Sequence, residues 1–187
     1  MTAANHAVLI KRAATASIVT AVTLMLAKVF AWSVSDSASV LSSLLDSLMD
    51  IAASLVNYFA VRYALMPADD DHPFGHTKAE GLAALVQSAF ILGSATFLLL
   101  HVVDRLLRPR ELAALEESIA VMLFSVVATI ALVIYQRWVY RQTQSLAIKA
   151  DSAHYYGDIL TSAAVVVALL AATVNLGLWQ LRRLEVR

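Results

Sequence analysis

The sequence contains no cysteine and few charged residues, and both absences narrow what the protein can be. With no cysteine in the 187 residues, the chain forms no disulfide and no thiolate metal site. Any metal must be bound by nitrogen and oxygen atoms, which suit Zn²⁺, Fe²⁺ or Mn²⁺ better than Cu⁺. Charged residues make up 15% of the chain, against about a quarter in soluble domains. They lie between long apolar runs, a pattern typical of a helical bundle in lipid.

Several functions are disfavoured by motifs that the sequence lacks. Acidic and basic residues are balanced at 14 each, so nothing indicates a nucleic-acid partner. No Gly-x-x-x-x-Gly-Lys-[Ser/Thr] loop occurs, so no ATP site of that kind is expected. No His-Glu-x-x-His motif occurs either, and this disfavours an intramembrane metallohydrolase.

Apolar segments of about 20 residues are long enough to cross a bilayer as helices. The sequence predicts an all-α transmembrane fold, a helical bundle with five spans, in a single domain. No signal-peptide pattern is present, so we expect the first span to be retained. A slight excess of Lys and Arg at one set of helix ends favours a cytoplasmic N-terminus. The domain covers residues 1–187, with spans at approximately 13–34, 40–65, 82–103, 118–138 and 146–179.

Two aspartates, Asp46 and Asp50, lie inside the second expected span. A charged side chain near the bilayer centre costs at least about 2.5–3.5 kcal/mol. Positions i and i+4 share one helix face, about 6 Å apart, and two carboxylates this close favour a shared proton or cation. We therefore expect Asp46 and Asp50 to hold a positive charge between them.

The fifth expected span repeats this spacing with His154 and Asp158. The second and fifth spans run antiparallel, and a rise of about 1.5 Å per residue brings both pairs to the middle of the membrane. One histidine nitrogen and three aspartate oxygens make four ligands, the number in a tetrahedral Zn²⁺ site. We therefore expect a metal site formed by Asp46, Asp50, His154 and Asp158.

The alternative is that Asp46 and Asp50 pair with Lys28 of the first span. We disfavour this pairing because Lys28 lies far enough along its helix for the side chain to reach the outer interface. One lysine would also leave Asp158 unexplained.

A polar loop between the second and third expected spans holds a second candidate site. Its pattern Asp69-x-x-His72-x-x-x-His76 offers one oxygen and two nitrogens for a metal, and a Pro and a Gly between the histidines bend the loop. Taken alone, such a loop is more often a solvated turn. Asp70 and Asp71 are alternative sources of the carboxylate.

These motifs resemble the cation diffusion facilitator family, specifically its bacterial zinc/ferrous-iron efflux branch, from about residue 8 to about residue 176. The stretches that carry the resemblance are Ser43 to Asp50 continuing to Asp70, His72 to Glu80, and Ala150 to Asp158. The resemblance implies a secondary active transporter and not an enzyme. It implies a homodimer in the bacterial cytoplasmic (inner) membrane, with cytoplasmic N-termini, which exports divalent metal in exchange for protons.

The resemblance also implies roles for individual residues. The transport-site positions of members that handle Zn²⁺, Cd²⁺ and Fe²⁺ match Asp46, Asp50, His154 and Asp158. A second metal site of this branch matches the loop residues Asp69, His72 and His76. The resemblance therefore favours a metal site over a solvated turn in this loop.

The sequence departs from the family pattern after the fifth expected span. Members of the family have a sixth span and a cytoplasmic C-terminal domain, so we expect a truncated form of the six-span fold with weakened dimer contacts. All expected transport ligands are present. Two functions stay open: a metal/proton antiporter, or a truncated metal-binding membrane subunit without transport activity of its own.

Overall fold

The computed structural model describes residues 3–35, 38–107 and 115–163, and this part of the chain is helical without strands. The expected fifth span, 146–179, lies outside the described residues after position 163. A fifth helical segment covers residues 146–163. The other helices are α1 (Ala3–Ser35), α2 (Ala38–Ala64), α3 (Ala79–Leu107) and α4 (Leu115–Thr143).

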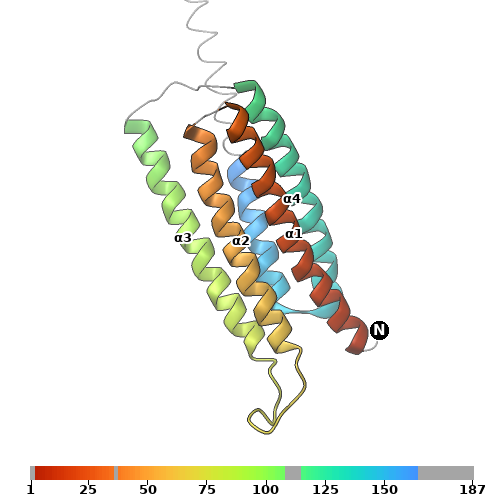
Figure 1. Ribbon diagram of the computed structural model, residues 1–187. Coiled ribbons are helices and arrows are strands. Elements are labelled where there is room, and N and C mark those ends of the chain that lie inside the picture. The colour runs from red at the N-terminus through yellow and green to blue at the C-terminus, as the bar shows by residue number, and fades with distance from the viewer. Residues whose placement is uncertain (1–2, 36–37, 108–114, 164–187) are drawn as a thin grey trace, which may run out of the picture.

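The helices form an elongated bundle with α3 at one edge (Figure 1). Helix α1 contacts both α2 and α4, and α2 also contacts α3. The N-terminus, the connection over residues 65–78 and the turn over residues 144–145 lie at the same end of the bundle (Figure 1). Successive helices therefore run antiparallel, as the short connections predict.

The bundle places apolar side chains outside and many polar side chains inside. Phe30 is 71% exposed, whereas Ser17 and Gln136 are buried. This distribution suits lipid, which offers no hydrogen bonds and therefore favours polar groups that bind one another in the interior. The described helices that are long and apolar enough to cross a membrane contain Ala4–Ser33, Ala79–Phe97 and Leu123–Thr143. The predicted all-α transmembrane fold is confirmed.

A buried polar network fixes the fifth helical segment against the bundle. The fully buried Asp151 carboxylate accepts hydrogen bonds from Ser17 Oγ of α1 at 2.5 Å and from Gln136 Nε2 of α4 at 2.7 Å. Gln136 Nε2 also lies 2.8 Å from Ser17 Oγ. Side chains three positions apart on a helix share a face, so this network also fixes the rotation of His154, three positions after Asp151.

The N-terminus of the fifth segment is capped by a glutamate from another helix. Glu80, in the first turn of α3, accepts hydrogen bonds from Ser145 Oγ at 2.9 Å and from the Leu146 backbone N–H at 3.1 Å. Gln144, which precedes Ser145, has a φ of 54°, and its N–H donates a 2.8 Å hydrogen bond to the Tyr140 carbonyl. This is the left-handed conformation that commonly ends a helix.

We expect Glu80→Ala to destabilise the protein by about 1–2 kcal/mol, since it removes both acceptors and leaves a helix N-terminus uncapped. Thermal unfolding in detergent checks this, and Glu80→Gln, which keeps one acceptor oxygen, should give an intermediate loss. Equal melting temperatures for wild type and Glu80→Ala would contradict the capping role.

Candidate metal sites

Three of the four expected membrane ligands meet between α2 and the fifth helical segment. His154 Nε2 lies 3.2 Å from Asp50 Oδ1 and 3.9 Å from Asp158 Oδ2. One ligand atom from each of the three lies within 4.8 Å of the others. Asp50 comes from α2, and the helical i, i+4 spacing brings His154 and Asp158 to one face. The three groups can together bind a single cation.

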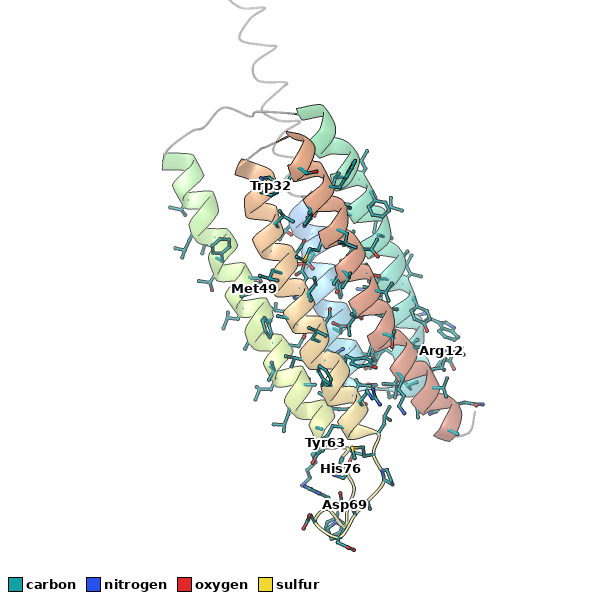
Figure 2. All side chains as sticks on the ribbon, viewed as in Figure 1. Arg12, Trp32, Met49, Tyr63, Asp69 and His76 are labelled. Carbon is teal, nitrogen blue, oxygen red and sulfur yellow. The ribbon has the colours of Figure 1, made fainter. Side chains whose placement is uncertain are left out.

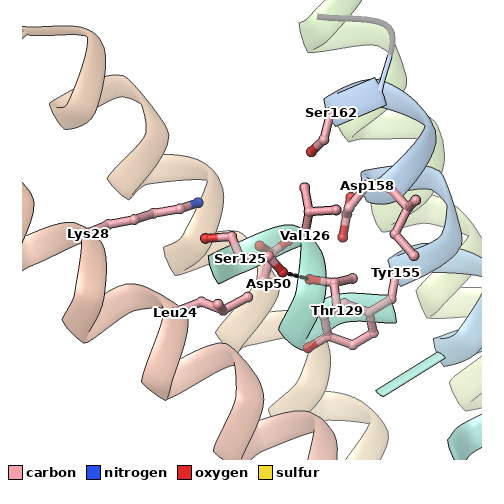
Figure 3. Close-up of a pocket in the computed structure, with 10 residues that line it drawn as sticks. Leu24, Lys28, Asp50, Ser125, Val126, Thr129, Tyr155, Asp158 and Ser162 are labelled. Carbon is pink, nitrogen blue, oxygen red and sulfur yellow. Dashed lines mark hydrogen bonds between the residues drawn. The ribbon is translucent and has the colours of Figure 1, made fainter. Parts of the chain in front are cut away.

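This cluster lies deep in the bundle, beside a small cavity. Asp50 is roughly 18 Å from the start of α2 and 21 Å from its end, at the rise of an α-helix. The cavity has a volume of about 70 Å³, and one water needs about 10–15 Å³, so an ion with a few waters fits. Figure 3 shows its wall, contributed by α1, α2, α4 and the fifth segment: Leu24, Lys28, Asp50, Ser125, Val126, Thr129, Tyr155, Asp158, Ile159 and Ser162.

Tyr155 fixes the helix that carries the histidine. Its hydroxyl lies 2.8 Å from Ser54 Oγ of α2 and donates a 3.3 Å hydrogen bond to the Ser17 carbonyl of α1. Tyr155 is buried, so it joins three helices at the level of the neighbouring His154. Contacts between protein residues alone thus hold the imidazole in place.

Asp46 does not belong to the three-residue cluster. Its side chain is exposed, one helical turn from Asp50. Its role as a fourth ligand stays a prediction. Zinc sites with three protein ligands and one water are also common.

The expectation that the Lys28 side chain reaches the outer interface is wrong. Lys28 Nζ donates a 2.6 Å hydrogen bond to Ser47 Oγ of α2, and the side chain lines the cavity with Asp50 and Asp158. Figure 3 shows Lys28 extending from α1 toward the cavity, with Asp158 on the other side and Asp50 between them. The charge of Lys28 interacts with Asp50, Asp46 and Asp158. Inside the bundle, nearby carboxylates and a hydroxyl take the place of water as partners of the ammonium, so the charge can stay there.

The expected loop residues also come together, at the end of the bundle. Asp69 Oδ1 lies 3.0 Å from His72 Nδ1, and Asp69 Oδ2 lies 3.4 Å from His76 Nε2. His76 is buried, and its ring centroid lies 4.5 Å from that of Tyr63. Figure 2 shows Tyr63 at the lower end of α2, with Asp69 and His76 in the loop below it. Within the described residues, the carboxylate of this group is Asp69; Asp70 and Asp71 are exposed outside it.

The backbone of the loop holds these ligands in place. Gly75 has a φ of 74°, and its N–H binds the His72 carbonyl at 2.9 Å. The His72 backbone N–H donates a 2.7 Å hydrogen bond to Asp69 Oδ1. Desolvation acts to raise the pKa of Asp69, but the hydrogen bonds from His72 and attraction to both histidines outweigh it, so this pKa lies below its ordinary value. The carboxylate therefore stays negatively charged.

Sequence patterns did not reveal the residues that support the membrane site. Tyr155, Asp151 and Gln136 were not predicted to have a role, although each is buried and hydrogen-bonded. A signal was present, because Asp151 lies one turn before His154 and polar residues such as Gln136 interrupt apolar runs.

Comparisons with known proteins identify related sequences. The family model of the cation efflux transmembrane domain matches residues 14–180. The cation-efflux pump FieF of Klebsiella pneumoniae subsp. pneumoniae is 52% identical over 161 residues, covering 86% of this chain and 54% of that protein. The same coverages hold for the FieF pumps of Citrobacter koseri, at 52% identity, and Salmonella arizonae, at 50%.

The chain thus spans about half the length of the curated relatives it matches. The family model, in contrast, covers most of the chain, including both α2 and the segment with His154 and Asp158. The chain belongs to the cation efflux transmembrane domain family.

Proposed function

We propose that the protein exports divalent metal cations across the inner membrane and that Asp50, His154 and Asp158 hold the cation, with Asp46 as the fourth ligand. The observation that carries this proposal is the meeting of three ligand groups midway along the helical bundle, within 4.8 Å of one another. Such groups are costly in lipid and mark ion pathways. Relatives named cation-efflux pumps support the direction of transport.

The ligand chemistry favours Zn²⁺ as the cargo, with Fe²⁺ or Cd²⁺ as further candidates. An imidazole nitrogen beside carboxylate oxygens suits Zn²⁺, whereas Mg²⁺ and Ca²⁺ favour sites made of oxygen alone. The cargo is a substrate, so it enters and leaves the cavity.

Proton exchange follows from the same ligands, because carboxylates and imidazole must be deprotonated to bind a metal. Protons and the metal therefore compete for Asp50, His154 and Asp158. In the proposed cycle the site takes metal from the cytoplasm, and protons from a more acidic exterior displace it.

The proposed orientation has a cytoplasmic N-terminus. The loop site lies at the same end of the bundle as the N-terminus (Figure 1), so Asp69, His72 and His76 would face the cytoplasm and bind a second metal there. A homodimer is part of this proposal, with one membrane site in each protomer. We further infer that residues 1–187 form one transmembrane domain.

We expect His154→Ala and Asp50→Asn each to weaken Zn²⁺ binding at least a hundredfold, since loss of a supporting residue alone typically costs about 10–100-fold. Calorimetric titration of the purified protein checks this. Asp70→Asn, in an exposed carboxylate outside both groups, is the control and should bind as wild type. Unchanged affinity in both site variants would refute the assignment.

We expect proteoliposomes to take up Zn²⁺ when a pH gradient is imposed and to stop when a protonophore collapses it. Asp50→Asn should abolish the flux because it removes both a ligand and a proton acceptor. Zinc binding without proton-coupled flux would instead favour a metal-binding membrane subunit without transport activity of its own.

We expect Gly75→Ala to weaken metal binding at the loop site about fivefold and to leave the membrane site unchanged. A Cβ at Gly75 meets no atom within 4 Å, so the effect comes from forcing a left-handed residue, at about 1–2 kcal/mol. Gly81→Ala is the matched control, since its Cβ also meets nothing and its backbone is helical. Equal effects of both variants in a Zn²⁺ titration would contradict this account.

A further inference from the structure

Lys28 is a positive charge at the wall of a cavity whose proposed cargo is also positive. It extends from α1 to Ser47 of α2, with a 2.6 Å hydrogen bond to that hydroxyl. It lines the cavity with Asp50 and Asp158. A lysine on the wall of a cation site repels the cargo, so its position needs a reason beyond packing.

Counting the formal charges of the three proposed carboxylate ligands and of Lys28 supplies that reason. Lys28 interacts electrostatically with three carboxylates, those of Asp50, Asp46 and Asp158. Three carboxylates and one ammonium leave a formal charge of minus two, because a histidine that binds metal is neutral. One divalent cation cancels this charge. Net charge inside a bilayer is costly, so the balanced state is the favourable one.

Among the described residues, Asp151 is a further carboxylate near the site, and it stands outside this count because it is not a proposed ligand. It does not line the cavity and accepts hydrogen bonds from Ser17 and Gln136, although it lies on the same face of its helix as His154. It also interacts with His154. Lys28 is the cationic side chain among the lining residues.

We propose that Lys28 is a tethered counter-charge of the transport cavity, which offsets one carboxylate so that a single divalent cation balances the site. This inference rests on the proposed function. Lysine suits the role because its ammonium is a compact charge on a flexible stem. When metal is absent, the ammonium partly neutralises the acids, and when metal is bound its repulsion limits affinity and aids release.

The competing explanation is structural: Lys28 serves only to join α1 to α2 through Ser47. The two explanations differ for Ser47→Ala, which removes the hydrogen bond but keeps the charge. They also differ in their dependence on ion charge, because Coulomb repulsion grows in proportion to the charge of the cargo.

The test is titration of the purified full chain with Zn²⁺ and, separately, with Tb³⁺, for wild type and four variants. Lys28→Met and Lys28→Gln remove the charge, Lys28→Arg keeps it, and Ser47→Ala removes its hydrogen-bond partner. Both neutral variants should bind Zn²⁺ at least tenfold more tightly, as expected for removal of a unit charge near a partly dry site. Their gain for Tb³⁺ should exceed that for Zn²⁺. Lys28→Arg and Ser47→Ala should stay within about threefold of wild type.

Unchanged or weaker Zn²⁺ binding in the neutral variants, or an equal change in Ser47→Ala, would overturn the counter-charge. If Lys28→Met does not fold, as judged by gel filtration and thermal unfolding, Lys28→Gln decides alone, since an amide can still bind Ser47. Failure of the proposed function gives a different result. In that case wild type either does not bind Zn²⁺ or binds it with an affinity that Asp50→Asn leaves unchanged.

Discussion

Polar groups inside a bilayer must satisfy one another, and the contact between His154 and Asp50 is the point on which the rest of this structure depends. The two side chains come from helices far apart in the sequence and meet at 3.2 Å. Removing either would leave the other without its charge-assisted partner at a depth where water is scarce. The surrounding network answers the same constraint, because Asp151, Tyr155 and their hydrogen-bond partners hold the helix of His154 in one rotation and depth. The interior is polar because the site has to be positioned, and the outer surface is apolar because lipid surrounds it.

The two candidate metal sites share structural supports although one lies inside the bundle and the other at its end. The loop with His76 leads directly into α3, where the Ala79 N–H binds the His76 carbonyl at 2.9 Å. The next residue, Glu80, caps the segment that carries His154 and Asp158. The loop is therefore connected to the helix that carries His154 by a few covalent bonds and hydrogen bonds. A short turn with a left-handed Gln144 closes the same end of the bundle.

The sequence predicted the helices and most of the residues that the two candidate sites bring together, because both depend on local rules. The cost of charge in lipid identified Asp50 and Asp158, and the helical period paired His154 with Asp158 on one face. The Asp69–His72–His76 spacing likewise predicted a group that the folded loop brings together. The direction of the Lys28 side chain was not predictable. Helical spacing shows which face of α1 carries Lys28, but not which neighbouring helix packs against that face. Helix bounds also differ from the apolar runs. Helix α1 begins at Ala3, because hydropathy indicates where lipid lies and not where backbone hydrogen bonds stop.

A site that transports must bind its cargo and also release it, and the exposure of the ligands bears on this. His154 is 4% exposed, whereas the side chains of Asp50 and Asp158 are 23% and 40% exposed. A structural zinc site is closed by four protein ligands, but here a nearly enclosed imidazole faces two carboxylates that remain partly accessible. The carboxylates thus form the less enclosed side of the candidate site, while the histidine is enclosed by its neighbours. Because the ligands are divided between α2 and the fifth segment, a small relative movement of these helices changes the distances between them. The affinity of the proposed site for metal would thus depend on helix position, which suits the proposed cycle of uptake and release.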